Sequence, residues 1–191
     1  MTATHSQPAE PEVPADIFHL DNEFWRFSLS FYGRSSVAPA CLVLRNRLGV
    51  DVLLVSIFAG VKRGRMLSAE DLRAANDLVA AWRVDIVENL RRIRKRLKSG
   101  RPPAPSVATE NLRTHVKAAE LRAEQIEPAL LLDWLDQRMP VVATSTIDAV
   151  ELLVRVTRHF ATTPADAASS RDIAQSIQVL TETINHVAKG G

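Results

Sequence analysis

The chain has little of several residue types, and each shortage excludes a class of protein. Its 191 residues include a single cysteine, which excludes a disulfide scaffold and any Cys-rich metal site and fits a reducing compartment. Seven glycines and 5% aromatic residues argue against an all-β sandwich or barrel. The longest uncharged apolar run, residues 52–61, is far shorter than the roughly 20 residues of a membrane span. We therefore expect a cytoplasmic globular protein without a transmembrane segment.

The N-terminal residues 1–20 have no lysine or arginine and carry three prolines and three acidic residues. A secretory signal needs a basic start and an apolar run, and a transit peptide needs arginines without acids. This stretch has neither pattern. We expect it to be a disordered acidic leader.

Hydrophobic periodicity predicts an all-α fold, a compact bundle of helices. The first helix is expected over residues 21–32, capped by Asp21 and ended by Gly33. It holds two adjacent aromatic-rich stripes, and we expect it to be largely buried as an anchor of the core. The stripes are Phe24, Phe27 and Phe31, and Trp25, Leu29 and Tyr32.

Two further helices are expected over residues 36–48 and 52–62, each closed by a glycine. Ser36 and Asp51 are their expected caps. The run Val52–Val55 also suits a buried strand, but we favour a helix because no partner strand is visible elsewhere.

A long helix is expected from the near capping box at Ser68 to Lys98, with a kink near Asp85. Its second half carries an apolar stripe, and a similar stripe follows the Pro-rich break at residues 99–106. Two stripes joined by a short linker predict an antiparallel hairpin of coiled-coil type. Pro128 either kinks the second helix or starts a new one over residues 129–138. The stripes are Ile86, Leu90, Ile93 and Leu97, then Leu112, Val116, Ala119, Ala123, Ile126 and Leu130.

The pattern divides the chain into the leader 1–20, a helical domain 21–138 and a C-terminal helical hairpin extension 139–191. In the extension Ile147, Val150 and Val154 mark one helix, and residues 162–166 make the turn. The second helix carries Ile173, Ile177, Leu180, Ile184 and Val187. Three arrangements stay open: the hairpin packs on the core, extends away from it, or pairs with a second subunit.

Several sequence blocks in a fixed order resemble a bacterial protein family, domain of unknown function 2390, over about residues 24–125. They include Phe24–Ser28 with Tyr32, Ala40–Leu44 leading to Gly49–Val52, Leu67–Ser68, Trp82, Leu90–Lys98 and Val116–Leu121. The resemblance implies a small soluble helical bacterial protein. It supplies no catalytic residues.

No motif of enzyme chemistry is present in the chain. It has no P-loop, dinucleotide fingerprint, zinc-protease motif or nucleophile elbow, and its five histidines lie far apart. Cys41 sits in an apolar run, so we expect a buried structural thiol. Asp133 and Asp136 are spaced to share a metal, but such pairs are more often solvated. We expect a non-enzymatic protein with no catalytic residue, no metal and no cofactor.

The strongest functional signal is a basic stretch, residues 83–101, with eight Lys/Arg against two acids. Its candidate surface for a polyanion or an acidic partner is Arg91, Arg92, Arg94, Lys95, Arg96, Lys98 and Arg101. The alternative is a solvated face paired with Glu110, Glu120 and Glu124 of the hairpin partner. No aromatic residue interleaves the cations, so single-strand stacking has no platform there.

The sequence predicts a helical protein that mediates protein–protein interaction or self-association, with an unknown protein partner or a second copy. The alternative function is binding of nucleic acid or another polyanion through helix 91–101. A DNA-binding helix-turn-helix over residues 51–82 is disfavoured, because Glu70 and Asp71 would lie beside the phosphates. An enzyme with a dispersed site also stays open.

Overall fold

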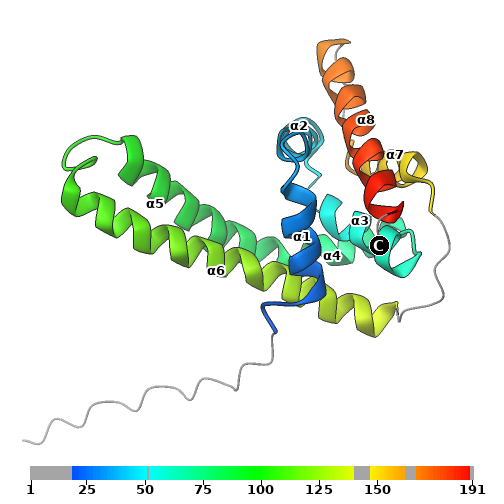
Figure 1. The fold of residues 1–191 in the computed structure, drawn as a ribbon, viewed down its shortest axis with the longest axis horizontal. Coiled ribbons are helices and arrows are strands. Elements are labelled where there is room, and N and C mark those ends of the chain that lie inside the picture. The colour runs from blue at the N-terminus through cyan, green and yellow to red at the C-terminus, as the bar shows by residue number, and fades with distance from the viewer. Residues whose placement is uncertain (1–18, 51, 140–146, 162–166, 190–191) are drawn as a thin grey trace, which may run out of the picture.

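The computed structural model describes residues 19–50, 52–139, 147–161 and 167–189. All regular elements in these ranges are helices, which confirms the predicted all-α fold (Figure 1). They are α1 (Glu23–Tyr32), α2 (Val37–Leu48), α3 (Leu53–Arg63), α4 (Ala69–Trp82), the π-helix η1 (Arg83–Val87), α5 (Glu88–Ser99), α6 (Val107–Arg138), α7 (Ala149–Phe160) and α8 (Ala167–Lys189).

Helix α1 anchors the core through one of its two predicted stripes. Phe24, Phe27 and Phe31 are buried, and the ring centroids of Phe24 and Phe27 lie 4.7 and 5.4 Å from that of Phe58 in α3. The expectation that the helix is largely buried is wrong for the second stripe, because Leu29 and Tyr32 are 54% and 43% exposed.

The cap of α1 also differs from the expectation. It is Asn22, whose Oδ1 accepts a hydrogen bond from the Trp25 amide at 2.8 Å. Asp21 instead lies 3.6 Å from Arg26 in an exposed ion pair. Asp and Asn are both good N-cap residues, because their side-chain oxygens accept hydrogen bonds from the N–H groups of the first turn. The prediction therefore placed the start of the helix one residue too early.

Helices α2 and α3 end as the glycines predict. Gly49 and Gly64 adopt left-handed conformations with φ of 70° and 61°, and their amides bond back into the helix ends. Helix α3 is buried along almost its whole length, so the helix interpretation of its apolar run is confirmed. Ser36 stands at the N-cap of α2 without a capping hydrogen bond from its side chain. The predicted cap Asp51 lies outside the described residues.

Helix α4 begins with the predicted capping box, formed by Ser68 and Asp71. The predicted kink near Asp85 coincides with η1, a five-residue π-helix between α4 and α5. Helix α6 continues through Pro128 to Arg138, so the alternative of a new helix starting there is wrong. The residues expected as a separate helix, 129–138, form the end of α6.

Helix α5 and the first part of α6 pack antiparallel and project from the rest of the molecule (Figure 1). We call residues 86–126, from the end of η1 through α5 into α6, the arm. No residue of α5 is buried, and no arm residue belongs to the hydrophobic core cluster. The core therefore forms without a contribution from the arm.

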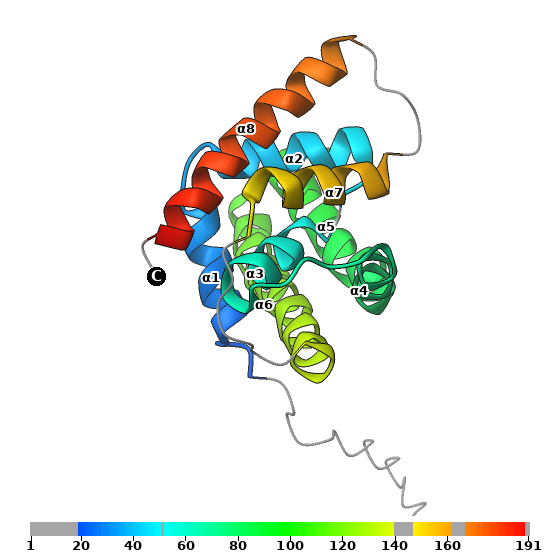
Figure 2. The ribbon, with the colours of Figure 1, turned by 90° about the vertical axis from the view of Figure 1, so that its right-hand side faces the viewer.

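The C-terminal helices α7 and α8 pack on α2 and α3 (Figure 2). Leu152, Leu153, Leu180 and Ile184 are buried in the same core cluster as the phenylalanines of α1. Of the three open arrangements, the hairpin adopts the one that packs on the core. Val150 and Val154 lie in α7 as predicted, and Ile147 precedes it; of these residues Val150 is 49% exposed. The predicted turn at 162–166 and the leader, except residues 19 and 20, lie outside the described residues.

Candidate interaction site

The side of α5 that faces α6 carries a partly buried ion-pair cluster, in which Glu120 is the buried member. Arg91 donates to Glu120 at 3.2 Å and to Glu124 at 2.6 Å, and Arg94 donates to both carboxylate oxygens of Glu120. Glu120 is only 5% exposed. Burial raises the pKa of its carboxyl, and the hydrogen bonds from Arg94 and Arg91 lower it by more, so the pKa lies below its ordinary value.

This cluster divides the predicted basic surface into two groups. Arg91 and Arg94 form ion pairs with Glu120 and Glu124 of α6, as the alternative of a salt-bridged basic face predicts for these two residues. Glu110, the third acid proposed for this role, pairs with Arg113 on its own helix instead.

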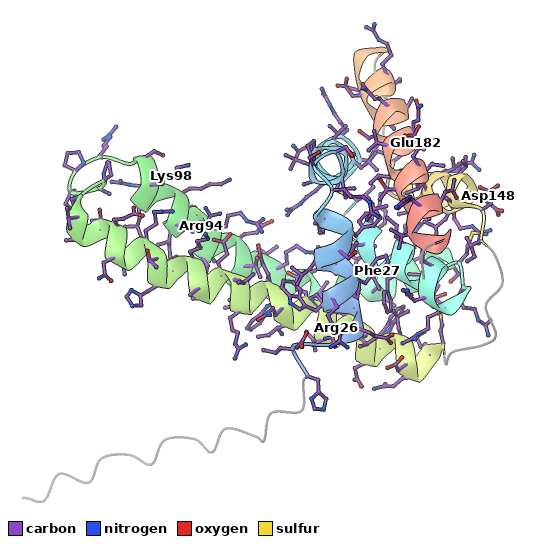
Figure 3. The ribbon with its side chains drawn as sticks, viewed as in Figure 1. Arg26, Phe27, Arg94, Lys98, Asp148 and Glu182 are labelled. Atoms are coloured by element: carbon purple, nitrogen blue, oxygen red, sulfur yellow. The ribbon has the colours of Figure 1, made fainter. Side chains whose placement is uncertain are left out.

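The other five cations are exposed on the arm: Arg92, Lys95, Arg96, Lys98 and Arg101. Figure 3 labels Arg94 and Lys98 on this projecting pair of helices. Arg92 donates to Asn89 at 2.6 Å, and Arg96 donates to the carbonyl of Arg101 at 2.9 Å. None of the five forms an ion pair with an acid in the part of the chain that the structure describes.

The predicted apolar stripes do not lie between the two helices but on one side of the hairpin. In α5, Leu90 and Ile93 immediately precede the ion-pairing Arg91 and Arg94. In α6, Ala119 and Ala123 immediately precede Glu120 and Glu124. Successive residues of an α-helix are rotated by about 100° about its axis. Seen along each chain from its N-terminus, both stripes are therefore rotated by the same angle, in the same direction, from the ion-paired side of their helix.

Because the two helices run antiparallel and face each other, equal displacements bring both stripes to the same side of the hairpin. We call this side the apolar flank and define it by Ile86, Leu90, Ile93, Leu97, Leu112, Val116, Ala119, Ala123 and Ile126.

The apolar flank is open to solvent over much of its length. Ile86, Ile93 and Leu112 are 37%, 47% and 52% exposed, and only Ala123 of the set is fully buried. Ion pairs therefore occupy the facing sides of the two helices, and the apolar side chains lie beside them, from the buried Ala123 to the exposed Ile93. We did not predict from the sequence that the apolar stripes lie beside the ion pairs. The signal was present, because each ion-pairing residue directly follows an apolar residue of the stripe in the sequence.

A groove of about 630 Å³ lies at the base of the arm, lined by residues of α1, α2, α3, η1, α5 and α6. Leu29, Tyr32 and Leu42 form its exposed apolar wall, and Cys41 lies half-buried within it. Burial raises the pKa of the Cys41 thiol to about 11, although a hydrogen bond from Tyr32 lowers it. Cys41 is thus an unreactive thiol at neutral pH, but less buried than expected.

Charged residues at the arm end of this groove occur as pairs. Arg83 lies 3.4 Å from Glu127, and Arg45 lies 2.6 Å from Glu88. Their charges compensate each other, so these pairs give the groove no preference for a ligand of one sign.

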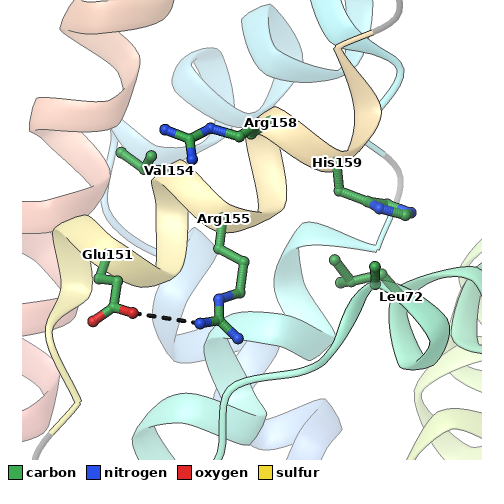
Figure 4. A pocket seen from close by; sticks show the side chains of 7 residues that line it. Leu72, Glu151, Val154, Arg155, Arg158 and His159 are labelled. Carbon is green, nitrogen blue, oxygen red and sulfur yellow. Dashed lines mark hydrogen bonds and ion pairs between the residues drawn. The ribbon is translucent and has the colours of Figure 1, made fainter.

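A smaller pocket of about 330 Å³ lies between the start of α4 and α7 (Figure 4). It is lined by Arg155, Arg158 and His159, and Arg155 lies 3.4 Å from Glu151. The neighbouring first turn of α4 is already capped by its own Asp71. Among the described residues, the buried polar side-chain atoms without a hydrogen-bond partner belong to Arg63 and Thr181, and neither lines this pocket.

Two further candidate residues have structural partners. Asp136 accepts from Arg63 at 2.8 Å, and Asp133 accepts from Gln137 at 2.8 Å. Among the described residues, no group of three His, Cys, Asp or Glu side chains is placed to hold a metal. Arg63 is 5% exposed, so it is not available to the helix-turn-helix considered above.

The comparisons with known proteins give a family and no activity. Neither a curated protein nor a solved structure matches the chain. Within the described residues, no helix is both long and apolar enough to cross a membrane. The model of the family described as "Protein of unknown function (DUF2390)" matches residues 23–131, which confirms the resemblance and extends it slightly at both ends. The chain therefore belongs to the DUF2390 family.

Proposed function

We propose that this chain is a non-enzymatic interaction protein that binds another protein, or a second copy of itself, through the arm. The observation that carries the proposal is the apolar flank, in which Ile86, Ile93 and Leu112 are exposed and Leu90, Leu97 and Val116 are half-buried. Scattered single apolar residues need no explanation, but a continuous exposed row marks a contact surface.

The design of the arm supports this role. The arm adds nothing to the hydrophobic core, and partly buried ion pairs join its two helices to each other. Apolar packing would stabilise an isolated hairpin better than these pairs, whose desolvation offsets much of their attraction. Apolar residues on the flank stabilise a complex when a partner packs over them and removes them from water.

The test is site-specific photo-crosslinking in living cells, with the photoreactive residue at position 93 or at position 121. Ile93 and Leu121 are 47% and 49% exposed, but Leu121 lies on the opposite side of Glu120 from the apolar flank. We expect a discrete crosslinked species from position 93 and none from position 121. Equal crosslinking from both positions, or none from either, contradicts the proposal.

A second candidate function is nucleic-acid binding, favoured by the five exposed cations of the arm. Such binding would be electrostatic and would weaken steeply with salt. The test is a gel shift with a DNA duplex at two salt concentrations, using wild-type protein and a variant with Arg92, Lys95 and Arg96 changed to glutamate. Loss of a salt-sensitive shift in the variant supports this function; unchanged or absent binding refutes it.

A further inference from the structure

The arm differs from the rest of the chain in its charge. It carries ten lysines and arginines against four acids, a net charge of +6 in a chain whose total is +2, so the remaining residues sum to −4. Each of the four acids forms an ion pair with an arginine. Only three of the ten arm cations take part in these pairs. The positive charge of the other seven therefore has no counter-charge among the described acids and is available to a ligand.

Three of these cations lie on one side of α5. With Arg91 as the reference and about 100° per residue, Lys98, Lys95 and Arg92 lie at about −20°, 40° and 100° around the helix. The apolar residues of α5 lie at about 200° to 260°, so Lys95 and Ile93 are on opposite sides of the helix. No apolar residue of α5 falls within the arc of the three cations.

Helix α6 adds a fourth cation, Lys117, to the same side of the arm. It precedes Glu120, which faces α5, by three residues and so lies about 60° round from it, on the side away from Ala119. Lys98 follows Arg94 by about one turn, and Arg94 pairs with Glu120, so Lys98 and Lys117 lie at the same level of the hairpin.

We call these four exposed side chains the basic face: Arg92, Lys95, Lys98 and Lys117. Figure 3 shows that Lys98 lies nearer the far end of the arm than Arg94. The basic stretch in the sequence does not contain Lys117, which joins the face only because the hairpin brings α6 beside α5.

From this arrangement we infer that the basic face binds the phosphate backbone of a nucleic-acid duplex. This inference rests on the second candidate function and names the residues and the form of nucleic acid. The three cations of α5 span six residues, about 9 Å along the helix. Duplex DNA carries one phosphate for about every 1.7 Å of its axis, so each cation can meet a phosphate.

The composition of the arm argues against other anionic ligands. A single strand binds through bases stacked on aromatic side chains, and the arm contains no Phe, Tyr or Trp. An anionic membrane takes apolar residues and cations from the same side of a helix, whereas Ile93 and Lys95 lie on opposite sides of α5. An acidic protein needs an apolar anchor at the centre of its interface, and the α5 part of the basic face offers none.

The experiment measures binding of the full chain to labelled nucleic acids by fluorescence anisotropy at several salt concentrations. The probes are a short DNA duplex, an RNA duplex of the same sequence and one of the DNA strands alone. We expect the duplexes to bind more tightly than the single strand. For the DNA duplex, four phosphate contacts predict a slope between about −3 and −4 in a plot of log K against log salt concentration.

Variants assign the binding to the basic face. Replacing Lys95, Lys98 and Lys117 by glutamine should weaken duplex binding at least about tenfold at low salt and make the slope less negative by about 1 for each cation removed. Lys117→Gln alone should change the slope by about 1, which a surface confined to α5 does not predict.

The matched control removes three exposed cations from the body of the molecule, by replacing Lys62, Arg65 and Arg73 with glutamine. It changes the net charge by the same amount and should bind the duplex like wild type. Circular dichroism shows whether each variant is folded.

The outcomes separate this inference from the function on which it rests. Duplex binding that the arm variant leaves unchanged, or that both triple variants weaken equally, overturns the basic face while nucleic-acid binding through another surface stands. Tighter binding of the single strand, or of phosphatidylglycerol vesicles in a sedimentation assay, overturns the assignment to a duplex. If the chain binds no nucleic acid, the inference and the second candidate function fall together. Crosslinking from position 93 tests the apolar flank independently, because the flank lies on the opposite side of the arm.

Discussion

Glu120 is the residue on which the shape of the arm most depends. Glu120 is 5% exposed, and its carboxylate accepts hydrogen bonds from Arg91 and Arg94, two of the contacts between α5 and α6. Replacing it with glutamine leaves the guanidinium group of Arg94 without its anion and leaves Arg91 with Glu124 alone. We expect Glu120→Gln to lower the free energy of unfolding by about 1–3 kcal/mol at neutral pH, measured by urea denaturation.

The pH dependence of this effect has a definite sign. The folded-state pKa of Glu120 is lowered, so its contribution is fully present above the ordinary glutamate pKa and is lost as pH falls through the folded value. The difference between wild type and Glu120→Gln should therefore shrink in acid. A difference that stays constant or grows as pH falls contradicts the assigned pairing.

Arg63 plays a comparable part inside the core. It is buried at the end of α3, pairs with Glu23 of α1 and Asp136 of α6, and lies 5.5 Å from the ring centroid of Phe58. Removing the Arg63 side chain breaks the ion pairs that link α3 to α1 and to α6. We expect Arg63→Ala to cost about 1–3 kcal/mol of unfolding free energy in urea titrations.

Arg26 provides the matched control for Arg63. Its pair with Asp21 is 3.6 Å long between side chains that are 63% and 79% exposed. Such exposed pairs contribute about 0–1 kcal/mol, so Arg26→Ala should be close to neutral. Equal effects of the two substitutions would show that Arg63 is not a structural link between the helices.

At the scale of the element, the arm should be separable from the core. Arg91 and Glu124 face each other, so a short turn closes the two helices just beyond them. We expect that replacing residues 96–118 by a short glycine-rich loop shifts the melting temperature by no more than about 4 °C, because no core residue is removed. Loss of a cooperative thermal transition in circular dichroism would show instead that the arm stabilises the core.

Helices and their ends followed closely from the sequence, because their determinants are local. Gly49 and Gly64 end their helices in the left-handed conformation that favours glycine, and Ser68 and Asp71 form the predicted capping box. The apolar run of α3 was correctly taken as a helix. The single-residue error at the cap of α1 shows the limit of this reasoning, since Asp21 and Asn22 are both good caps.

The facing sides of helices were harder to predict, because they depend on contacts distant in sequence. The stripe containing Ile93 and Leu112 suggested a buried seam, yet Glu120 occupies the facing side. The exposed stripe of α1, with Leu29 and Tyr32, was missed for the same reason. Periodicity tells which residues share a side of a helix, and it does not tell what covers that side. Of the seven proposed cations, the sequence likewise did not identify Arg91 and Arg94 as the paired ones.

At the scale of the whole molecule, the hydrophobic core extends beyond the last residue that the family model matches. The match ends at residue 131, while the core continues into α7 and α8 through Leu152, Leu153, Leu180 and Ile184. The packing is close: a Cβ added at Gly60 of α3 would lie 2.4 Å from Leu152 Cδ1. In this chain the C-terminal helices are thus part of the fold that the matched segment builds.

A chain that ends at Arg138 should therefore not fold cooperatively. Its loss of α7 and α8 exposes apolar side chains of α2 and α3, among them Leu44 and Ile57, which are fully buried in the complete chain. We expect a broad thermal transition and strong binding of a hydrophobic dye. The arm-shortened chain is the comparison, because it loses residues without opening the core. A sharp transition in the Arg138 truncation would identify residues 21–138 as an independent domain.

We propose the apolar flank of the arm as the docking surface of this protein. Hydrogen–deuterium exchange of the full chain, with and without the protein that the crosslink at position 93 captures, tests this most directly. We expect slower amide exchange in α5 and in the first part of α6 when that protein is bound, and unchanged exchange in α7 and α8. Protection in the groove beside α1 and α2, or no protection in the arm at a saturating concentration of that protein, would contradict the proposal.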